Sequence, residues 1–383
     1  MNAKLERQKQ HNSRVLREDV LEQRSCFRAL PEVIALHTTE RCNLRCGMCV
    51  RSLGQGTRQL PTADLVRLCD DLFPTARKVA LSAAAGEPLL ADFEPVLDRA
   101  LAHGVRVDVV TNGLALTPEL YAAAAPVFDH VNVSIDSADP RTYELIRVDG
   151  SFERLDRNLT SIGEHRRARP DGVLLTLSAV VMRTNLERLD ELVDYARRIG
   201  ADGLILQRLR HSGLAVPHLD PSTSPGPAAV QAALDRVRAR AVAAQVSVSF
   251  SDFGQPNHFA RPVRDKVPPE LTGAGICSFV AQHFGVQPTG EVYACCYPTD
   301  HRLGDLRTQR AAEIWNGAAA QALRTAHFSR RGSVFCRGCA HAPHLSRRGP
   351  AWWNQWWKHA RLRWALVRAP LRARRAERAT RAS

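Results

Sequence analysis

The chain has 383 residues, a net charge of +14 and ten cysteines. Its first residues are polar and charged, and its longest apolar stretch, Val173 to Met182, is about half of the roughly 20 residues that a span needs, which excludes a signal peptide and a transmembrane helix. We therefore expect a cytoplasmic protein whose cysteines bind metal, since the cytosol keeps thiols reduced.

Apolar runs of strand length alternate with helical patterns through the first half of the chain. The predicted strands are Val33 to Thr38, Lys78 to Ser82, Val105 to Val110, His130 to Ile135, Val173 to Val181 and Gly203 to Gln207. The predicted helices are Thr62 to Phe73, Ala91 to His103, Thr117 to Ala125, Phe152 to Ala168 and Asn185 to Ile199. Successive β-α units predict an α/β fold with a parallel sheet and helices outside, in either a doubly wound sheet or a barrel.

The second half of the chain changes character. Residues from Arg208 to Pro227 are rich in Pro, Gly and Ser, and predict a linker or a substrate-facing loop. The elements expected after it are a helix over Pro227 to Ala244, a short strand near Val246 to Phe250, and a hairpin of His283 to Gln287 and Glu291 to Ala294.

The most specific motif comprises Cys42, Cys46 and Cys49, with the spacing C-x3-C-x2-C directly after the first predicted strand. Three thiolates on a cubane of four irons leave one iron without a protein ligand, free to bind a small molecule. The alternative is a structural zinc loop, but a closed zinc site needs four ligands, usually in two C-x2-C pairs.

This motif resembles the signature of the radical SAM superfamily. The resemblance implies a partial (β/α)6 TIM-like barrel over residues 30–210, with its chemistry at the C-terminal ends of the strands. It also implies that the three cysteines hold a [4Fe-4S] cluster, which binds S-adenosylmethionine (SAM) and reduces it to a 5′-deoxyadenosyl radical. Met48 stands where many members carry an aromatic residue near the adenine, although core packing explains a methionine there equally well.

The loops after the next strands extend the resemblance to the SAM site. Gly86, Glu87 and Pro88 match a G-G-E-P loop that receives the SAM amino group, with Ala85 in place of its first glycine. Further SAM contacts implied by the resemblance are Thr111, Asn112, Ser134 and Asp136 at the ends of the third and fourth strands, and Arg147, which would pair with the SAM carboxylate. An exposed turn glutamate and ordinary helix N-caps are the alternatives for these loop residues.

A second cysteine set follows the spacing C-x12-G-x4-C and then C-x2-C. It resembles the auxiliary-cluster region of SPASM and twitch proteins, and implies one auxiliary [4Fe-4S] cluster held by Cys277, Cys295, Cys336 and Cys339 in a small domain over residues 277–343. A four-cysteine zinc site is the alternative. Cys296 is a spare thiol, an exchange ligand, or a hydrogen donor to a substrate radical.

The last segment, residues 344–383, combines five tryptophans with a basic end. The residues from Lys358 to Ser383 include nine basic side chains and one acidic side chain, so they carry most of the net charge. The rest of the chain is only mildly basic, which does not indicate a nucleic-acid-binding core. Tryptophan on one helix face and arginine on the other predict peripheral contact with the inner membrane surface. A helix docked on the barrel and an acidic protein partner are the alternatives.

The resemblance implies hydrogen abstraction from an unactivated C–H bond, with electrons from a flavodoxin- or ferredoxin-type reductant. Relatives of this layout oxidise or epimerise sugars and aminocyclitols, or modify ribosomally made peptides. Peptide-modifying relatives often carry a leader-binding domain, for which the N-terminal extension of residues 1–29 is too short. Sequence therefore favours an oxidoreductase or epimerase that acts on a small molecule. Residues 211–276 are expected to form a linker between the barrel and the auxiliary domain. A peptide maturase, and a non-catalytic iron-sulfur binding or assembly protein, are the alternatives.

Overall fold

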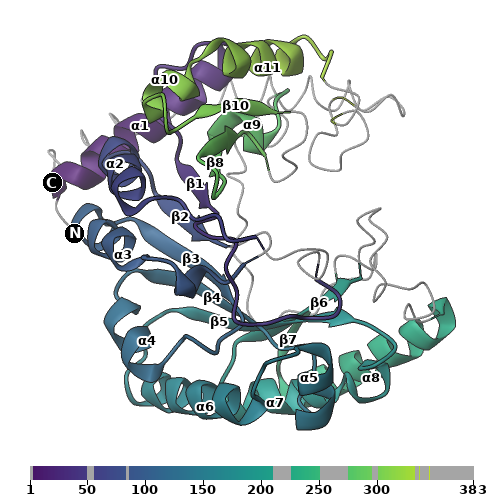
Figure 1. Ribbon diagram of the computed structural model, residues 1–383. Coiled ribbons are helices and arrows are strands. Elements are labelled where there is room, and N and C mark those ends of the chain that lie inside the picture. Colours follow the sequence, from purple (N-terminus) through teal and green to yellow (C-terminus); the bar gives the residue numbers. More distant parts are fainter. Residues whose placement is uncertain are drawn as a thin grey trace, which may run out of the picture.

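The computed structural model describes residues 3–49, 56–82, 86–209, 226–250, 275–295, 301–332, 336 and 345. Within these residues ten strands form one sheet in the order β10-β9-β8-β1-β2-β3-β4-β5-β6-β7. The sheet curves into an open barrel, with the helices that follow β2 to β6 along its convex side (Figure 1). The α/β class and the partial TIM-like barrel are confirmed.

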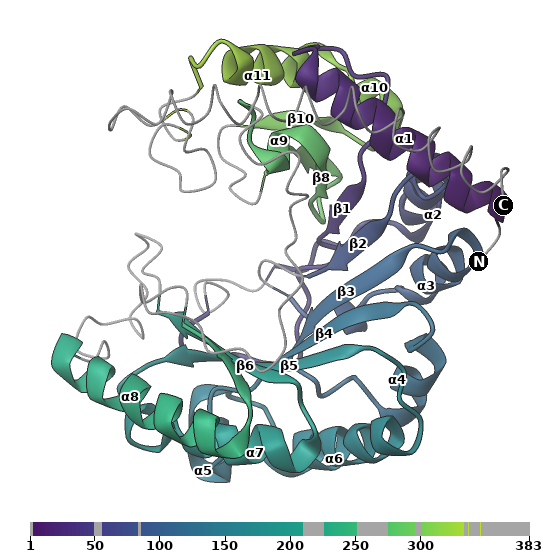
Figure 2. The same cartoon turned by 180° about the vertical axis from the view of Figure 1, so that it is seen from behind.

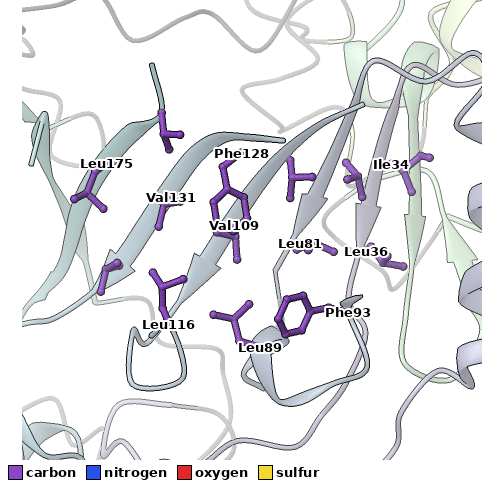
Figure 3. Close-up of a cluster of buried hydrophobic side chains, with 14 of the residues drawn as sticks. Ile34, Leu36, Leu81, Leu89, Phe93, Val109, Leu116, Phe128, Val131 and Leu175 are labelled. Atoms are coloured by element: carbon purple, nitrogen blue, oxygen red, sulfur yellow. The ribbon is translucent and has the colours of Figure 1, made fainter. Parts of the chain in front are cut away.

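The barrel strands are parallel and nearly coincide with the predicted ones. They are β1 (Val33–Leu36), β2 (Lys78–Leu81), β3 (Arg106–Thr111), β4 (Phe128–Ser134), β5 (Leu174–Val181), β6 (Gly203–Arg208) and β7 (Ser247–Ser249). Alternate residues, such as Val131 and Val133 on β4, are fully buried against the helices. Figure 3 shows this core, in which Ile34, Leu81, Val109 and Leu175 come from four strands.

The barrel helices are α2 (Thr62–Leu72), α3 (Glu94–His103), α4 (Pro118–Ala124), α5 (Pro140–Ile146), α6 (Phe152–Ala168), α7 (Glu191–Ile199) and α8 (Pro227–Ala244). Short 3-10 turns, η2 (Pro88–Leu90) and η3 (Leu186–Arg188), precede α3 and α7. The helix expected from Asn185 therefore begins as a 3-10 turn. Helix α6 has its predicted bounds because the Ser151 side chain accepts a hydrogen bond from the Arg154 backbone N–H at its start. None of the helices in the described ranges is long and apolar enough to cross a bilayer.

The C-terminal part continues the barrel sheet. Strand β8 (His283–Val286) pairs in parallel with β1, and β9 (Glu291–Tyr293) and β10 (Arg302–Asp305) extend the sheet in antiparallel fashion. Helices α9 (Ser278–Gln282), α10 (Ala311–Trp315) and α11 (Ala318–Phe328) complete this part. The hairpin was predicted, but β10 and the helices α9, α10 and α11 were not. The expected linker lies largely outside the described residues, as do Ala85, Cys296, Cys339 and the tryptophan-rich tail.

The N-terminal extension forms helix α1 (Ala3–Leu21), which the sequence does not predict because its buried face carries polar side chains. Lys9 on this face is 1% exposed and donates to the carbonyl oxygens of Ala76 and Gly104. Burial lowers the pKa of Lys9 to about 8. Asp19, in the last turn of the helix, accepts hydrogen bonds from the backbone N–H groups of Arg28 and Ala29 in the loop that follows. The helix therefore docks on the barrel through satisfied polar contacts.

A buried arginine on α11 binds the C-terminal helices to the loop between α1 and β1. Arg324 on α11 is 1% exposed, and its guanidinium lies 4.0 Å above the Phe27 ring and 4.3 Å above the Trp315 ring. It donates to Ser25 O at 3.0 Å and to Trp315 O at 2.8 Å. Figure 2 shows α1 running beside α10 and α11. Arg324 thus fixes α11 against the segment that precedes β1.

We predict that Arg324→Met lowers the free energy of unfolding by about 3 kcal/mol, because two buried carbonyl oxygens and two aromatic faces lose a charged partner. Thermal unfolding of the full chain measures this effect. Arg331→Met is the matched control, since Arg331 is exposed just beyond the same helix. Equal melting temperatures for the two variants would contradict the role given to Arg324.

Candidate radical SAM and auxiliary cluster sites

Cys42, Cys46 and Cys49 lie in the segment between β1 and α2, beyond the C-terminal end of β1. The loop is bound to the end of α5 and the residues that follow it by two backbone hydrogen bonds, from Gly47 N to Ile146 O at 3.1 Å and from Arg45 N to Val148 O at 3.0 Å. The Arg45 guanidinium also contacts both carboxylate oxygens of Asp149, at 2.6 and 2.9 Å. The positions of the three cysteines are therefore set by contacts distant in sequence.

Glu87, in the loop after β2, is buried with 1% of its surface exposed. Its carboxylate accepts hydrogen bonds from Thr111 Oγ1 at 2.6 Å, from Asn112 N at 2.7 Å and from Leu89 N at 3.2 Å. Burial raises the pKa of Glu87, and these donors act in the opposite direction. Three residues that sequence predicts at the SAM site thus meet, and the carboxylate ties the loop after β2 to the end of β3.

The same network reaches the cysteine loop. Asn112 Nδ2 donates to Asn43 Oδ1 at 2.7 Å and lies 4.0 Å from Cys42 Sγ. The Glu87 backbone N–H donates to Arg41 O at 2.8 Å. Beside it, a Cβ on Gly86 would lie 2.3 Å from Thr39 O, so this position requires glycine. The loops after β1, β2 and β3 therefore form one connected unit.

Arg147 and Asp136, both predicted SAM contacts, form an ion pair with 2.7 Å between Nη2 and Oδ2. Asp136 has a left-handed backbone with φ of 65° and accepts a hydrogen bond from Val180 N at 2.7 Å. Such a conformation is costly for a non-glycine residue and is often found at functional sites. The Nε–H of the buried Arg147 has no hydrogen-bond acceptor among the described residues. This agrees with the predicted pairing of Arg147 with the SAM carboxylate.

The cysteines lie within electrostatic reach of this ion pair. Burial raises the pKa of the Cys46 thiol to about 11, Arg147 opposes the shift, and Asp136, Cys49 and Cys42 add to it. A thiol that binds a metal is deprotonated outright, so iron would reverse this shift. Within the described ranges no three side chains of Cys, His, Asp or Glu converge on a single-ion site. A cubane makes no such demand, because each thiolate binds a different iron. The mutual influence of Cys42, Cys46 and Cys49 shows that the three thiols are neighbours, as a shared cluster requires.

Two further predicted residues lie nearby. Ser134 Oγ, at the end of β4, is 3.4 Å from Ser178 Oγ on β5. Met48 packs against a small apolar cluster of Ile146, Met182 and Leu209. This contact agrees with core packing, which was predicted for Met48 as the alternative to a contact with adenine.

The auxiliary cysteines lie at the edges of the C-terminal elements. Cys277 precedes α9, Cys295 follows β9, and both Cys277 and Cys336 are 7% exposed. Two histidines that the sequence analysis missed contact this group: His327 Nδ1 accepts from Cys277 N at 3.4 Å, and His301 Nε2 lies 3.2 Å from Cys336 Sγ. Single histidines form no pattern with the cysteine spacing, so sequence held no signal for them.

Two family models match the sequence of this chain. Residues 36–196 match the radical SAM superfamily, and residues 277–340 match the SPASM iron-sulfur cluster-binding domain. The chain belongs to the radical SAM superfamily. A [4Fe-4S] cluster with SAM and an auxiliary iron-sulfur cluster are therefore its cofactors, as the sequence predicts.

Curated radical SAM relatives cover much of the chain. Mycofactocin maturase MftC from Mycolicibacterium smegmatis is 30% identical over 271 residues, which are 69% of this chain and 64% of that protein, so the match spans just under two thirds of that relative. MftC from Mycobacterium ulcerans is 30% identical over 301 residues, 75% of each chain. PqqA peptide cyclase from Streptomyces rochei is 27% identical over 334 residues, 82% of this chain and 83% of that one.

The fold is also similar to a solved structure, that of Streptococcus suis SuiB bound to the precursor peptide SuiA. The TM-score is 0.61 at 12% sequence identity, and the match covers 89% of this chain and 76% of SuiB. At this identity the likeness concerns the fold alone.

We predict that replacing Cys42, Cys46 and Cys49 together by alanine halves the iron content, from about eight to about four per chain, and abolishes SAM cleavage. The remaining iron belongs to the auxiliary cluster. Iron analysis and 5′-deoxyadenosine assays after anaerobic reconstitution measure both effects. Cleavage that persists in the triple variant would contradict the assignment of these cysteines.

We also predict that Gly86→Ala lowers the rate of SAM cleavage about a hundredfold, since the new Cβ must displace backbone atoms next to the cysteine loop. Gly226→Ala is the matched control, because a Cβ there meets nothing within 4 Å. A rate for Gly86→Ala equal to that of the control would show that the loops tolerate the added methyl group.

Proposed function

We propose that this radical SAM enzyme is a maturase of a ribosomally made peptide. The observation that carries the proposal is the 30% identity to mycofactocin maturase MftC over 75% of each chain. The similarity to PqqA peptide cyclase over 82% of this chain points to the same substrate class. The sugar or aminocyclitol substrate favoured by sequence has less support, because these two relatives, which match most of the chain, are a maturase and a peptide cyclase.

The concave face of the sheet supports a polar substrate such as a peptide. His130 Nε2 lies 2.7 Å from Thr176 Oγ1, and Thr176 Oγ1 lies 3.2 Å from Asn132 Oδ1. These residues alternate along β4 and β5 with the apolar side chains that face the helices, so they line the opposite face. Peptide amides need both donors and acceptors when they lose water, and imidazole, hydroxyl and carboxamide groups provide both.

When bound, the SAM cluster and its SAM supply the 5′-deoxyadenosyl radical that abstracts a hydrogen atom from the substrate. In our proposal Cys42, Cys46 and Cys49 hold that cluster. Glu87, Thr111 and Asn112 keep the surrounding loops in register, together with Gly86.

The remaining predicted contacts complete this assignment. Arg147 is paired with Asp136 through Nη2, and its Nε has no acceptor among the described residues, so this N–H suits the SAM carboxylate. Ser134 ends β4 two residues before Asp136. In the C-terminal part, Cys277, Cys295, Cys336 and Cys339 would hold the auxiliary cluster, with Cys296 as a candidate hydrogen donor.

The substrate class is tested by supplying candidates. We expect that short peptides encoded beside the gene, added to the reconstituted enzyme with SAM and a reductant, undergo a mass change and raise 5′-deoxyadenosine formation. The Cys42, Cys46 and Cys49 triple variant is the negative control. Modification of sugars or aminocyclitols, with none of these peptides altered, would overturn the proposal.

We further predict that His130→Phe lowers peptide-dependent 5′-deoxyadenosine formation about tenfold, because one hydrogen-bonding group at the substrate face is lost. His165→Phe is the control, since His165 lies on α6 on the convex side and packs against Tyr121. Measuring kcat/KM for the peptide separates the two variants. Equal kcat/KM values for the two variants would show that the concave face of β4 does not bind the peptide.

A further inference from the structure

His301 is a buried histidine that contacts one of the predicted auxiliary cysteines. It is 6% exposed, and its Nε2 lies 3.2 Å from Cys336 Sγ. The β9–β10 hairpin places it there: the backbone N–H of Ala294, the residue before Cys295, donates to His301 O at 3.2 Å. The backbone of His301 thus pairs with the residue before Cys295, while its side chain contacts Cys336, 35 residues further along the chain.

The short nitrogen-to-sulfur distance indicates a hydrogen bond. Each iron of a cubane takes one external ligand, and ligands on different irons diverge from one another. With Cys336 on one iron, a nitrogen 3.2 Å from its sulfur is too close to bind a second iron. A thiolate only accepts hydrogen bonds, so the nitrogen must carry the proton.

We propose that His301 donates an Nε2–H hydrogen bond to the Cys336 thiolate and thereby raises the reduction potential of the auxiliary cluster. Reduction adds negative charge that spreads onto the cysteine sulfurs, and an N–H donor stabilises the reduced state more than the oxidised one. The contact is buried, where low dielectric strengthens such a bond. His301 is thus a positioning and tuning residue that makes the auxiliary cluster a better electron acceptor.

His327 contacts the same group of cysteines in a different way. Its Nδ1 accepts a hydrogen bond from the backbone N–H of Cys277, and it lies on α11, one turn from the buried Arg324. This contact orients the main chain at Cys277. The two histidines therefore have separable roles: His327 contacts the backbone of Cys277, whereas His301 contacts the sulfur atom of Cys336 at 3.2 Å.

The test uses the full chain carrying Cys42→Ala, Cys46→Ala and Cys49→Ala, so that the auxiliary cluster gives the whole iron signal. Two further variants are made in this parent chain: His301→Leu, which removes the hydrogen-bond donor, and His301→Gln, which retains an N–H donor. Tyr293→Phe is the matched control, because its hydroxyl lies 3.3 Å from Glu291 Oε2 in the same hairpin. EPR-monitored redox titration and iron analysis are the measurements.

We expect His301→Leu to keep the iron content of the parent while its midpoint potential falls. The potentials of His301→Gln and Tyr293→Phe should stay close to that of the parent. An unchanged potential in His301→Leu would overturn the proposal.

Pulsed EPR of the parent chain with 15N-labelled histidine gives an answer even if His301→Leu does not fold. A weak nitrogen coupling, lost in His301→Gln, is the expected signature of a hydrogen bond through His301. A strong coupling from nitrogen bound directly to iron would make His301 a ligand and overturn the proposal.

Discussion

A buried carboxylate connects the parts of the SAM site. Glu87 is almost fully removed from water, and a charge in that position is stable only if donors replace its hydration. The required donors come from Thr111 Oγ1, Asn112 N and Leu89 N, so the loop after β2 must lie against the end of β3. The Glu87 N–H and the Asn112 side chain then bind the cysteine loop. The cost of burying one charge thus fixes three loops relative to one another.

A second set of charges secures the other side of the cysteine loop. Asp136 and Asp149 both have left-handed backbones, and each pairs with an arginine, Arg147 and Arg45 respectively. The Arg147 pair is buried, whereas Arg45 and Asp149 are largely exposed, so the former contributes more to the rigidity of the site. The cysteine loop is therefore held both through Glu87 and through the segment after α5.

Sequence predicted those parts of the fold that follow simple periodicity. The strands other than β10, together with α6 and α8, were placed within about two residues, because β-branched runs and amphipathic spacing mark them directly. Helix α1 was missed because Lys9, Asn12, Ser13 and Asp19 lie on its buried face, where a pattern search expects apolar residues. Helix α11 depends similarly on the buried Arg324, whose partners Ser25 and Phe27 are about 300 residues away in sequence.

The candidate site was predicted as a set of residues rather than as a network. Motif resemblance identified Glu87, Thr111 and Asn112 as SAM contacts, and the structure reveals that they bind one another. Arg147 was expected to pair with SAM, and its pairing with Asp136 arises from a left-handed turn that sequence does not reveal. His301 and His327 carried no motif, since their contacts with Cys336 and Cys277 exist only after the C-terminal elements fold.

The central claim is that the Glu87 network presents three thiolates to a cluster with one open iron. Mössbauer spectra of the 57Fe-reconstituted full chain, recorded with and without SAM, test it most directly. The account predicts that SAM changes the environment of one iron in one cluster and leaves the auxiliary cluster unaltered. Identical spectra in the presence and absence of saturating SAM would contradict it.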